Sequence, residues 1–377
     1  MSCWRSLLMA DPGKKTYRVL VLSVIKHAYL PDAVAAHPRF ALVAVADDAL
    51  RPDWTHERNQ KYADMHAIPY CRNVEEAFRN FDCDIAVISS EAERHCDLAM
   101  RAVRAGLHII VDKPLSPDVQ ECQSLSELIK QSGLKGMVWN RNFLPALIEA
   151  RLALSEGAIG DLLAVHCDFY FSKDAGPPKE TETMGSPPID WLDRQLEAHA
   201  DGSDGGVGTQ PMGELQIEGI YPLAYINSIC SSPFERVVAS TATHFHQANV
   251  DNQVDDLAAL SFVLENGVIG SLAIGRIGAA SHPDIGEIKL HLIGTRGALV
   301  VSEARPEVGL HYKDQPKNEF KNIRIDNDND FLLMDAFADA LDCGTELPLD
   351  IETACNIARI IDAAQISANE GREVKIS

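Results

Sequence analysis

The chain has 377 residues, of which 46% are hydrophobic and 24% charged. This composition is typical of a globular protein, and the length suffices for two domains. The formal net charge of −21 argues against nucleic acid or an anionic membrane surface as a partner, because both attract basic patches.

The cysteines and the amino terminus give a first expectation about location. Nine cysteines without a Cys-x-x-Cys pair predict reduced thiols in a cytoplasmic protein, rather than a disulfide framework or a zinc site. Residues 1–16 contain only a short apolar patch, so we expect a disordered leader and not a signal peptide. We predict no metal site.

The first half of the chain alternates apolar runs with amphipathic segments. We expect strands at 17–22, 40–46, 84–89, 107–111 and 135–139, and helices at 27–36, 59–66, 74–81, 94–105 and 117–132. Strands separated by helices of this length indicate βαβ units. The pattern therefore predicts an α/β domain with a doubly wound parallel sheet over residues 17–138.

The strand expected at 107–111 is followed directly by Asp112, Lys113 and Pro114. Ligands of open α/β sheets bind beyond the carboxyl ends of the strands, and a proline restricts the turn that presents the lysine. A lysine there that is screened from water beside a cationic ring can act as a base and stabilise an alkoxide. Lys113 is therefore a candidate catalytic residue, although many Asp-Lys-Pro turns are merely solvated.

The first strand-to-helix turn is the usual site of a dinucleotide pyrophosphate, and here it contains no glycine. Ser23 is small enough for a glycine position, whereas Ile25 stands where a side chain should obstruct the phosphates. Lys26 and His27 offer positive charge instead. We expect these four residues to line the cofactor site and NAD to bind more weakly than in a glycine-bearing relative.

Asp47 ends the second expected strand. A carboxylate at this position accepts hydrogen bonds from the adenosine ribose and repels a 2′-phosphate, which favours NAD over NADP. The alternative is an ordinary acidic turn residue.

Two further segments carry a family resemblance. The first runs from Val87 to His95 and the second from Asp112 to Leu115, with a helix ending at Gly106 between them. Together they resemble the glucose–fructose oxidoreductase / inositol dehydrogenase (Gfo/Idh/MocA) family, whose pattern is Thr-Pro-Asn-x-x-His and then Glu-Lys-Pro-Leu. The positions that match or replace motif residues are Ser90, Glu91, Ala92, His95, Asp112 and Lys113.

The resemblance implies a Rossmann domain that binds NAD, followed by an α+β domain on a large, open, mostly antiparallel sheet at 139–377. It implies cofactor contacts for Ser90, Glu91, Asp112, Lys113 and Arg141, with His95 packed near the cofactor. It also implies a homodimer or homotetramer formed through the second sheet.

The segment Met212–Ala224 resembles the family helix that ends in Gly-Ile-Tyr-Pro-Leu. Tyr221 falls on the catalytic His/Tyr position of the family. The family aspartate four residues earlier is replaced by Ile217, and Glu218 is the nearest acid that can share a helical face with Tyr221. We expect Lys113 and Tyr221 to form the catalytic pair, with Glu218 as a candidate partner of the tyrosine.

These expectations define an NAD(P)-dependent oxidoreductase that moves hydride to or from a secondary hydroxyl or keto group of a sugar, polyol or related ring. Two alternatives stay open. The missing glycines and aspartate are also compatible with a sensor-like protein that binds a ligand without turnover, or with an enzyme that uses NAD transiently in a redox-neutral lyase or glycosidase reaction.

Overall fold

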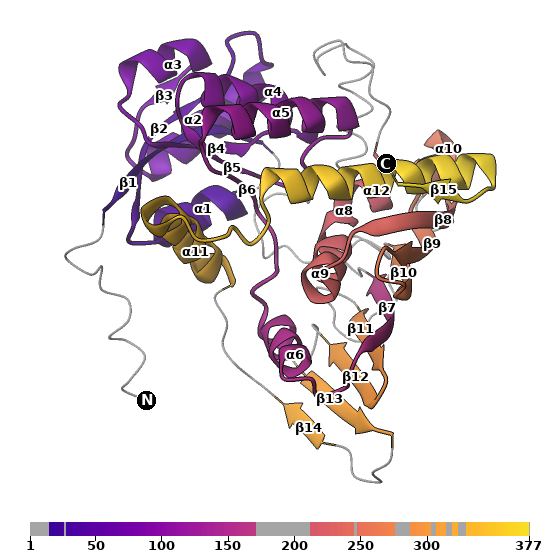
Figure 1. Cartoon of the computed structure of the whole chain (residues 1–377). Helices are drawn as coiled ribbons and strands as arrows, with labels where there is room; N and C mark the ends of the chain where they lie inside the picture. Colours follow the sequence, from indigo (N-terminus) through magenta and orange to yellow (C-terminus); the bar gives the residue numbers. More distant parts are fainter. Residues whose placement is uncertain are drawn as a thin grey trace, which may run out of the picture. The chain divides into compact units, whose positions relative to one another are not determined.

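The computed structural model describes residues 15–25, 28–170, 212–244, 247–275, 287–302, 307–313, 319–322 and 329–376 (Figure 1). The chain forms two compact units. The first contains residues 1–141 and 328–355, and the second contains 142–327 and 356–377.

The first unit contains a parallel sheet of six strands among its described residues, in the order β3-β2-β1-β4-β5-β6. The predicted doubly wound parallel sheet is therefore confirmed. Its core strands are buried along nearly their whole length, as their apolar runs require. The strands are β1 (Tyr17–Val24), β2 (Phe40–Ala46), β3 (Tyr70–Cys71), β4 (Ile85–Ser89), β5 (His108–Val111) and β6 (Gly136–Val138).

Helices α4 and α5 pack against each other in this unit, and α1 packs against α11. The sequence gives clear boundaries to two of them, since the Asn73 side chain caps the start of α3 and Gly133 ends α5 in a left-handed conformation. The helices are α1 (Tyr29–Ala36), α2 (Asp53–Met65), α3 (Val74–Asn80), α4 (Ala92–Arg104), α5 (Val119–Ser132) and α11 (Asn329–Cys343).

Helix α11 belongs to the first unit although it lies late in the chain. This division differs from the expected second domain at 139–377. Arg39, whose side chain is only 4% exposed, donates to Asp339 at 2.6 Å and also pairs with Asp342. The Tyr17 hydroxyl donates to Asp342 at 2.6 Å. These bonds attach α11 beside the start of β1 and β2.

The second unit contains a sheet of nine strands among the residues described, in the order β14-β13-β12-β11-β7-β10-β9-β8-β15. Only β7 and β10 pair in parallel, so the predicted mostly antiparallel sheet is confirmed. The strands are β7 (Leu162–Tyr170), β8 (Phe234–Ala242), β9 (Leu257–Leu264), β10 (Ile269–Gly275), β11 (Glu287–Gly294), β12 (Gly297–Ser302), β13 (Glu307–Tyr312), β14 (Glu319–Asn322) and β15 (Val374–Lys375).

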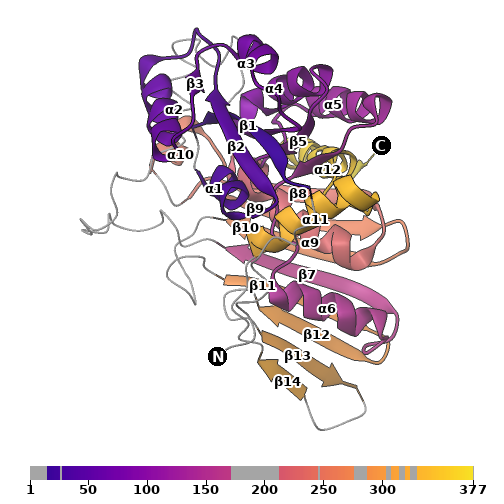
Figure 2. The same cartoon turned by 90° about the vertical axis from the view of Figure 1, so that its left-hand side faces the viewer.

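Helices cover one face of this second sheet. Helix α6 contacts β12 and β13, and α9 contacts β7 (Figure 2). Helix α8 contacts β9 and β10. The opposite face leaves Val238, Ile269 and Ile293 exposed by 45%, 55% and 41%. The helices are α6 (Pro145–Ser155), α8 (Glu214–Glu218), α9 (Ile220–Cys230), α10 (Gln247–Asn252) and α12 (Ile351–Glu370), which begins in the first unit.

Among the described helices, none combines the length and the hydropathy that a membrane span requires. In the same residues the cysteines are free thiols.

Candidate active site

Lys113 follows β5 and is buried, with 4% of its surface exposed. Asp112 is fully buried before it and accepts a hydrogen bond from the Lys113 amide at 2.8 Å. The Lys113–Pro114 peptide bond is cis. The turn therefore holds a lysine amino group in an enclosed position at the carboxyl edge of the parallel sheet.

His95 joins this turn to the neighbouring strand. The ring is fully buried, with Nδ1 2.7 Å from the Pro114 carbonyl oxygen and Nε2 3.0 Å from the Ser90 carbonyl oxygen. Ser90 follows β4, so the imidazole connects the ends of β4 and β5. The structure thus brings together Ser90, His95, Asp112 and Lys113.

The glycine-free turn after β1 is stabilised by side chains. Ser23 adopts a left-handed conformation with φ 66°, which glycine adopts at lower cost. The Val24 amide donates to Asn59 Oδ1 at 2.7 Å, and the Ile25 amide donates to the Ser89 carbonyl at 3.1 Å. Ile25 is fully buried, so its side chain packs in the protein interior.

The Asp47 carboxylate, which is fully buried, organises this turn. One oxygen accepts from Ser23 Oγ at 2.7 Å and from Asn59 Nδ2 at 2.9 Å. The other accepts from the Asp48 amide at 2.8 Å and from Arg94 Nη2 at 2.6 Å. Four donors fill the lone-pair positions of a carboxylate, so the predicted ribose contact requires one donor to leave.

The charge of Asp47 changes the pKa values of neighbouring groups. Burial, followed by the negative charge of Asp47, raises the pKa of Tyr70 to about 12. Burial would lower the pKa of Arg94, but the charges of Asp47, Glu91 and Asp48 outweigh it and raise that pKa. The carboxylate and the guanidinium are therefore held as an ion pair.

Arg94 lies at the centre of a larger ion-pair network. Its guanidinium also reaches Glu91 and Asp48, each at 3.1 Å. Arg51 pairs with the other Glu91 oxygen at 2.7 Å, and Arg101 pairs with Asp48 at 2.8 Å. The predicted cofactor residues Asp47 and Glu91 thus share one cation.

The remaining predicted cofactor residues are Lys26, His27 and Arg141. Lys26 and His27 lie outside the described residues. Arg141 is half-buried at the last position of the first segment of unit 1.

Tyr221 belongs to the second unit and lies in the first turn of α9. It is 4% exposed, and its ring lies 6.3 Å from that of Phe169 on β7. Helix α8 ends at Glu218 and α9 begins at Ile220, with Gly219 between them. Adding a Cβ to Gly219 would bring it within 2.3 Å of the Leu215 carbonyl oxygen, so the close junction requires glycine.

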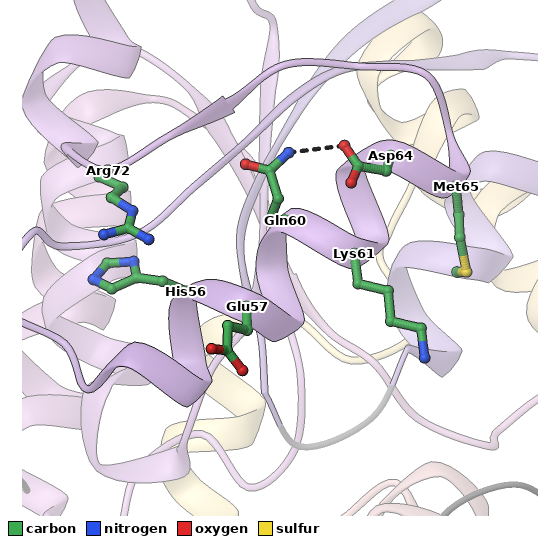
Figure 3. Close-up of a pocket in the computed structure, with 7 residues that line it drawn as sticks. All are labelled: His56, Glu57, Gln60, Lys61, Asp64, Met65 and Arg72. Atoms are coloured by element: carbon green, nitrogen blue, oxygen red, sulfur yellow. Dashed lines mark hydrogen bonds between the residues drawn. The ribbon is translucent and has the colours of Figure 1, made fainter.

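A shallow pocket of about 570 Å³ lies along α2 in the first unit (Figure 3). The predicted site residues do not line it. Its wall has mixed charge and consists of His56, Glu57, Gln60, Lys61, Asp64, Met65 and Arg72. In the part of the chain that the structure describes, no group of three or more His, Cys, Asp or Glu residues is arranged to hold a metal ion.

Sequence reasoning missed Arg94 and Asn59. Arg94 stands directly before His95 in the motif, and a lone charged residue there was the available signal. Asn59 had no signal, because its role depends on Asp47, which is 12 residues away in sequence and hydrogen-bonded only through the fold.

The polar groups at this sheet edge suit a dinucleotide. The carboxyl ends of β1, β2 and β4 are adjacent, and this is the switch point where doubly wound sheets bind ligands. Asp47 places a carboxylate at this edge, and Arg94 places a guanidinium there, a group suited to phosphate oxygens. The fold and this sheet edge define the class, a protein with a dinucleotide-binding Rossmann domain.

Two family models match the chain. The model described as an oxidoreductase family with an NAD-binding Rossmann fold matches residues 22–139, and the model of the family's C-terminal alpha/beta domain matches residues 209–376. The chain belongs to the Gfo/Idh/MocA family of oxidoreductases.

Relatives cover the chain to different extents. An uncharacterized oxidoreductase of Escherichia coli is 28% identical over 119 residues, which are 30% of this chain and 34% of that protein. The inositol 2-dehydrogenase of Rhizobium meliloti is 23% identical over 78% of this chain and 82% of its own length. An Agrobacterium radiobacter oxidoreductase, solved with NAD+, L-tartaric acid and magnesium, has a TM-score of 0.76 at 14% identity and covers 96% of this chain and 99% of its own.

Proposed function

We propose that the protein is an NAD-dependent dehydrogenase or reductase that acts on a secondary hydroxyl or keto group of a sugar, polyol or related cyclic compound. The observation that carries this proposal is the enclosed lysine at the carboxyl end of β5. Lys113 is 4% exposed on a turn fixed by Asp112 and His95. The polyol dehydrogenase from Rhizobium meliloti among the relatives supports the substrate class.

Lys113 is the proposed proton-transfer residue. NAD would supply the hydride acceptor for the substrate carbon when bound, so the proton on the oxygen of that carbon must pass to a base. An amino group shielded from bulk water is suited to accept that proton and to stabilise the developing alkoxide by its charge. The Asp112 carboxylate and the His95 ring keep the backbone on both sides of Lys113 in one position, which limits the reorganisation needed in the transition state.

Tyr221 is the proposed second group, with its hydroxyl orienting the substrate oxygen or relaying its proton. Packing against Phe169 restricts the ring. Glu218 is the proposed partner of the tyrosine, since it lies three residues earlier at the end of α8. We expect Tyr221→Phe and Glu218→Gln each to lower kcat by about tenfold or more, non-additively if the two act as one unit.

The test is oxidation of a panel of sugars and polyols with NAD and with NADP, together with calorimetric binding of both cofactors. We expect turnover with NAD, and Lys113→Ala should abolish turnover while the NAD dissociation constant changes by less than a few-fold. Near wild-type kcat in Lys113→Ala would exclude the lysine from proton transfer.

The same measurements separate the alternatives. Binding of NAD without turnover of any polyol or sugar would favour a sensor-like protein. Turnover without net NADH formation would favour a redox-neutral lyase or glycosidase. A clear preference for NADP would refute the role of Asp47 at the ribose.

We also propose a homo-oligomer formed through the second sheet. The face of that sheet opposite its helices leaves Val238, Ile269 and Ile293 exposed. Exposed β-branched side chains on an uncovered sheet face suit a second copy of the same face.

A further inference from the structure

The Asp47–Arg94 ion pair crosses the place where a dinucleotide has to lie. Asp47 follows β2, and Arg94 lies in the first turn of α4, after β4. Strand β1 lies between β2 and β4 in the sheet, so the 2.6 Å contact spans the carboxyl end of β1. In a doubly wound sheet the pyrophosphate occupies this position and the acid after β2 binds the ribose.

In the part of the turn after β1 that the structure describes, the backbone amides of Val24 and Ile25 are already engaged. The turn contains no glycine, and these two amides are bonded to Asn59 and Ser89. A pyrophosphate requires compensating donors or charge, which backbone amides usually supply. A side-chain cation can take that role, and among the described residues of this edge Arg94 is the cation in contact with Asp47.

Arg94 has the required chemistry. Of the four donors to Asp47, only the Arg94 guanidinium is charged and has further N–H groups matched to phosphate oxygens. The other three donors are the Ser23 hydroxyl at the turn, the Asn59 amide on α2 and the backbone N–H of Asp48 directly after Asp47. When Arg94 departs, one lone-pair position of Asp47 becomes available to a ribose hydroxyl.

We propose that Arg94 is a partner-exchanging residue of the cofactor site, bound to Asp47 in the free protein and to the pyrophosphate in the complex. In this exchange the dinucleotide supplies a hydroxyl donor to Asp47 and phosphate acceptors to Arg94. The ribose contact of Asp47 and the phosphate contact of Arg94 therefore form only when the dinucleotide binds. This inference rests on the proposed use of NAD.

The sharpest test compares two ligands, NAD and inorganic pyrophosphate, by calorimetry on the full chain. Arg94→Met should weaken the binding of both ligands about tenfold or more. A tenfold change corresponds to about 1.4 kcal/mol, which is close to the contribution expected of a hydrogen bond to a charged group. Asp47→Asn should weaken NAD binding, because a ribose acceptor is lost. The same variant should strengthen pyrophosphate binding, because Arg94 is released. An exchange of partners predicts these opposite signs and also predicts that the gain for pyrophosphate requires Arg94, whereas removal of the Asp47 charge alone would strengthen pyrophosphate binding with or without Arg94.

Arg101→Met is the matched control. Arg101 lies on the same helix and pairs with Asp48, Glu75 and Asp97, but it does not contact Asp47. Both affinities of this variant should stay within about twofold of wild type.

Unchanged or tighter NAD and pyrophosphate binding by Arg94→Met would overturn the proposal and leave Arg94 as a structural brace of Asp47. If Arg94→Met does not fold, the double variant with Asp47→Asn removes the buried unpaired carboxylate. That variant should bind pyrophosphate more weakly than Asp47→Asn alone, and equal affinity would refute the exchange. If wild type binds pyrophosphate but not NAD, the proposed cofactor use fails and the pyrophosphate comparison still decides the role of Arg94.

Discussion

Replacement of Ser23 separates two opposing contributions to stability at one residue. Its backbone has φ 66°, and its hydroxyl donates to the buried Asp47 carboxylate at 2.7 Å. A left-handed conformation costs a non-glycine residue about 1 kcal/mol relative to glycine. A hydrogen bond to a charged group contributes about 1.5–3 kcal/mol.

Ser23→Ala removes the bond and keeps the strained backbone, so we expect a loss of about 1.5–3 kcal/mol in the free energy of unfolding. Ser23→Gly also removes the bond but relieves the backbone, so the expected loss is about 0.5–2 kcal/mol. The glycine variant should therefore be more stable than the alanine variant, by about 1 kcal/mol.

The assay is urea-induced unfolding, followed by circular dichroism and by tryptophan fluorescence. Ala67 is the control, because it is also left-handed with φ 52° but has no side-chain hydrogen bond to lose. Ala67→Gly should raise the free energy of unfolding by about 1 kcal/mol. If Ser23→Ala is as stable as Ser23→Gly while Ala67→Gly is stabilised, the reasoning about the Ser23 turn is wrong.

Three further predictions concern other parts of the molecule. Arg39→Met should lower the free energy of unfolding by about 2–3 kcal/mol in the same urea assay, because the carboxylates of α11 lose a buried partner. Ile269→Glu should shift the protein from oligomer to monomer in light scattering, because it places a charge on the exposed sheet face. Burial raises the pKa values of Asp48 and Asp84, but bonds from Arg101 to Asp48 and from the Arg18 amide and Lys15 to Asp84 outweigh it and lower both. Their stabilisation is present above the unfolded value of 3.8 and should be lost as the pH falls through the folded values.

Each of these has an outcome against it. A fully stable Arg39→Met would mean that apolar packing alone holds α11. An oligomer that survives Ile269→Glu would place the subunit contact elsewhere. Stability that does not fall below about pH 4 would show that the two aspartates keep their ordinary pKa values in the folded protein.

The sequence by itself determined the class of fold. Apolar runs such as that of β1 identify buried strands, and the helical segments between the runs identify the sheet as parallel. Both patterns are local properties of the chain, so the sequence shows them directly. It also made Lys113 a candidate catalytic residue, because the acid, lysine and proline stand together at a strand end. Strand β3 was missed because two half-buried residues give no periodic signal.

Only the tertiary structure decided what surrounds the predicted cofactor residues. Asp47 and Arg94 are 47 residues apart, and Arg39 and Asp342 are 303 apart, so no local pattern connects them. Asp47 looked like a free ribose ligand because a sequence shows that an acid ends a strand, but not which donors the fold brings to it. Its side-chain partners come from β1, α2 and α4, which become neighbours only when β1 inserts between β2 and β4 in the sheet.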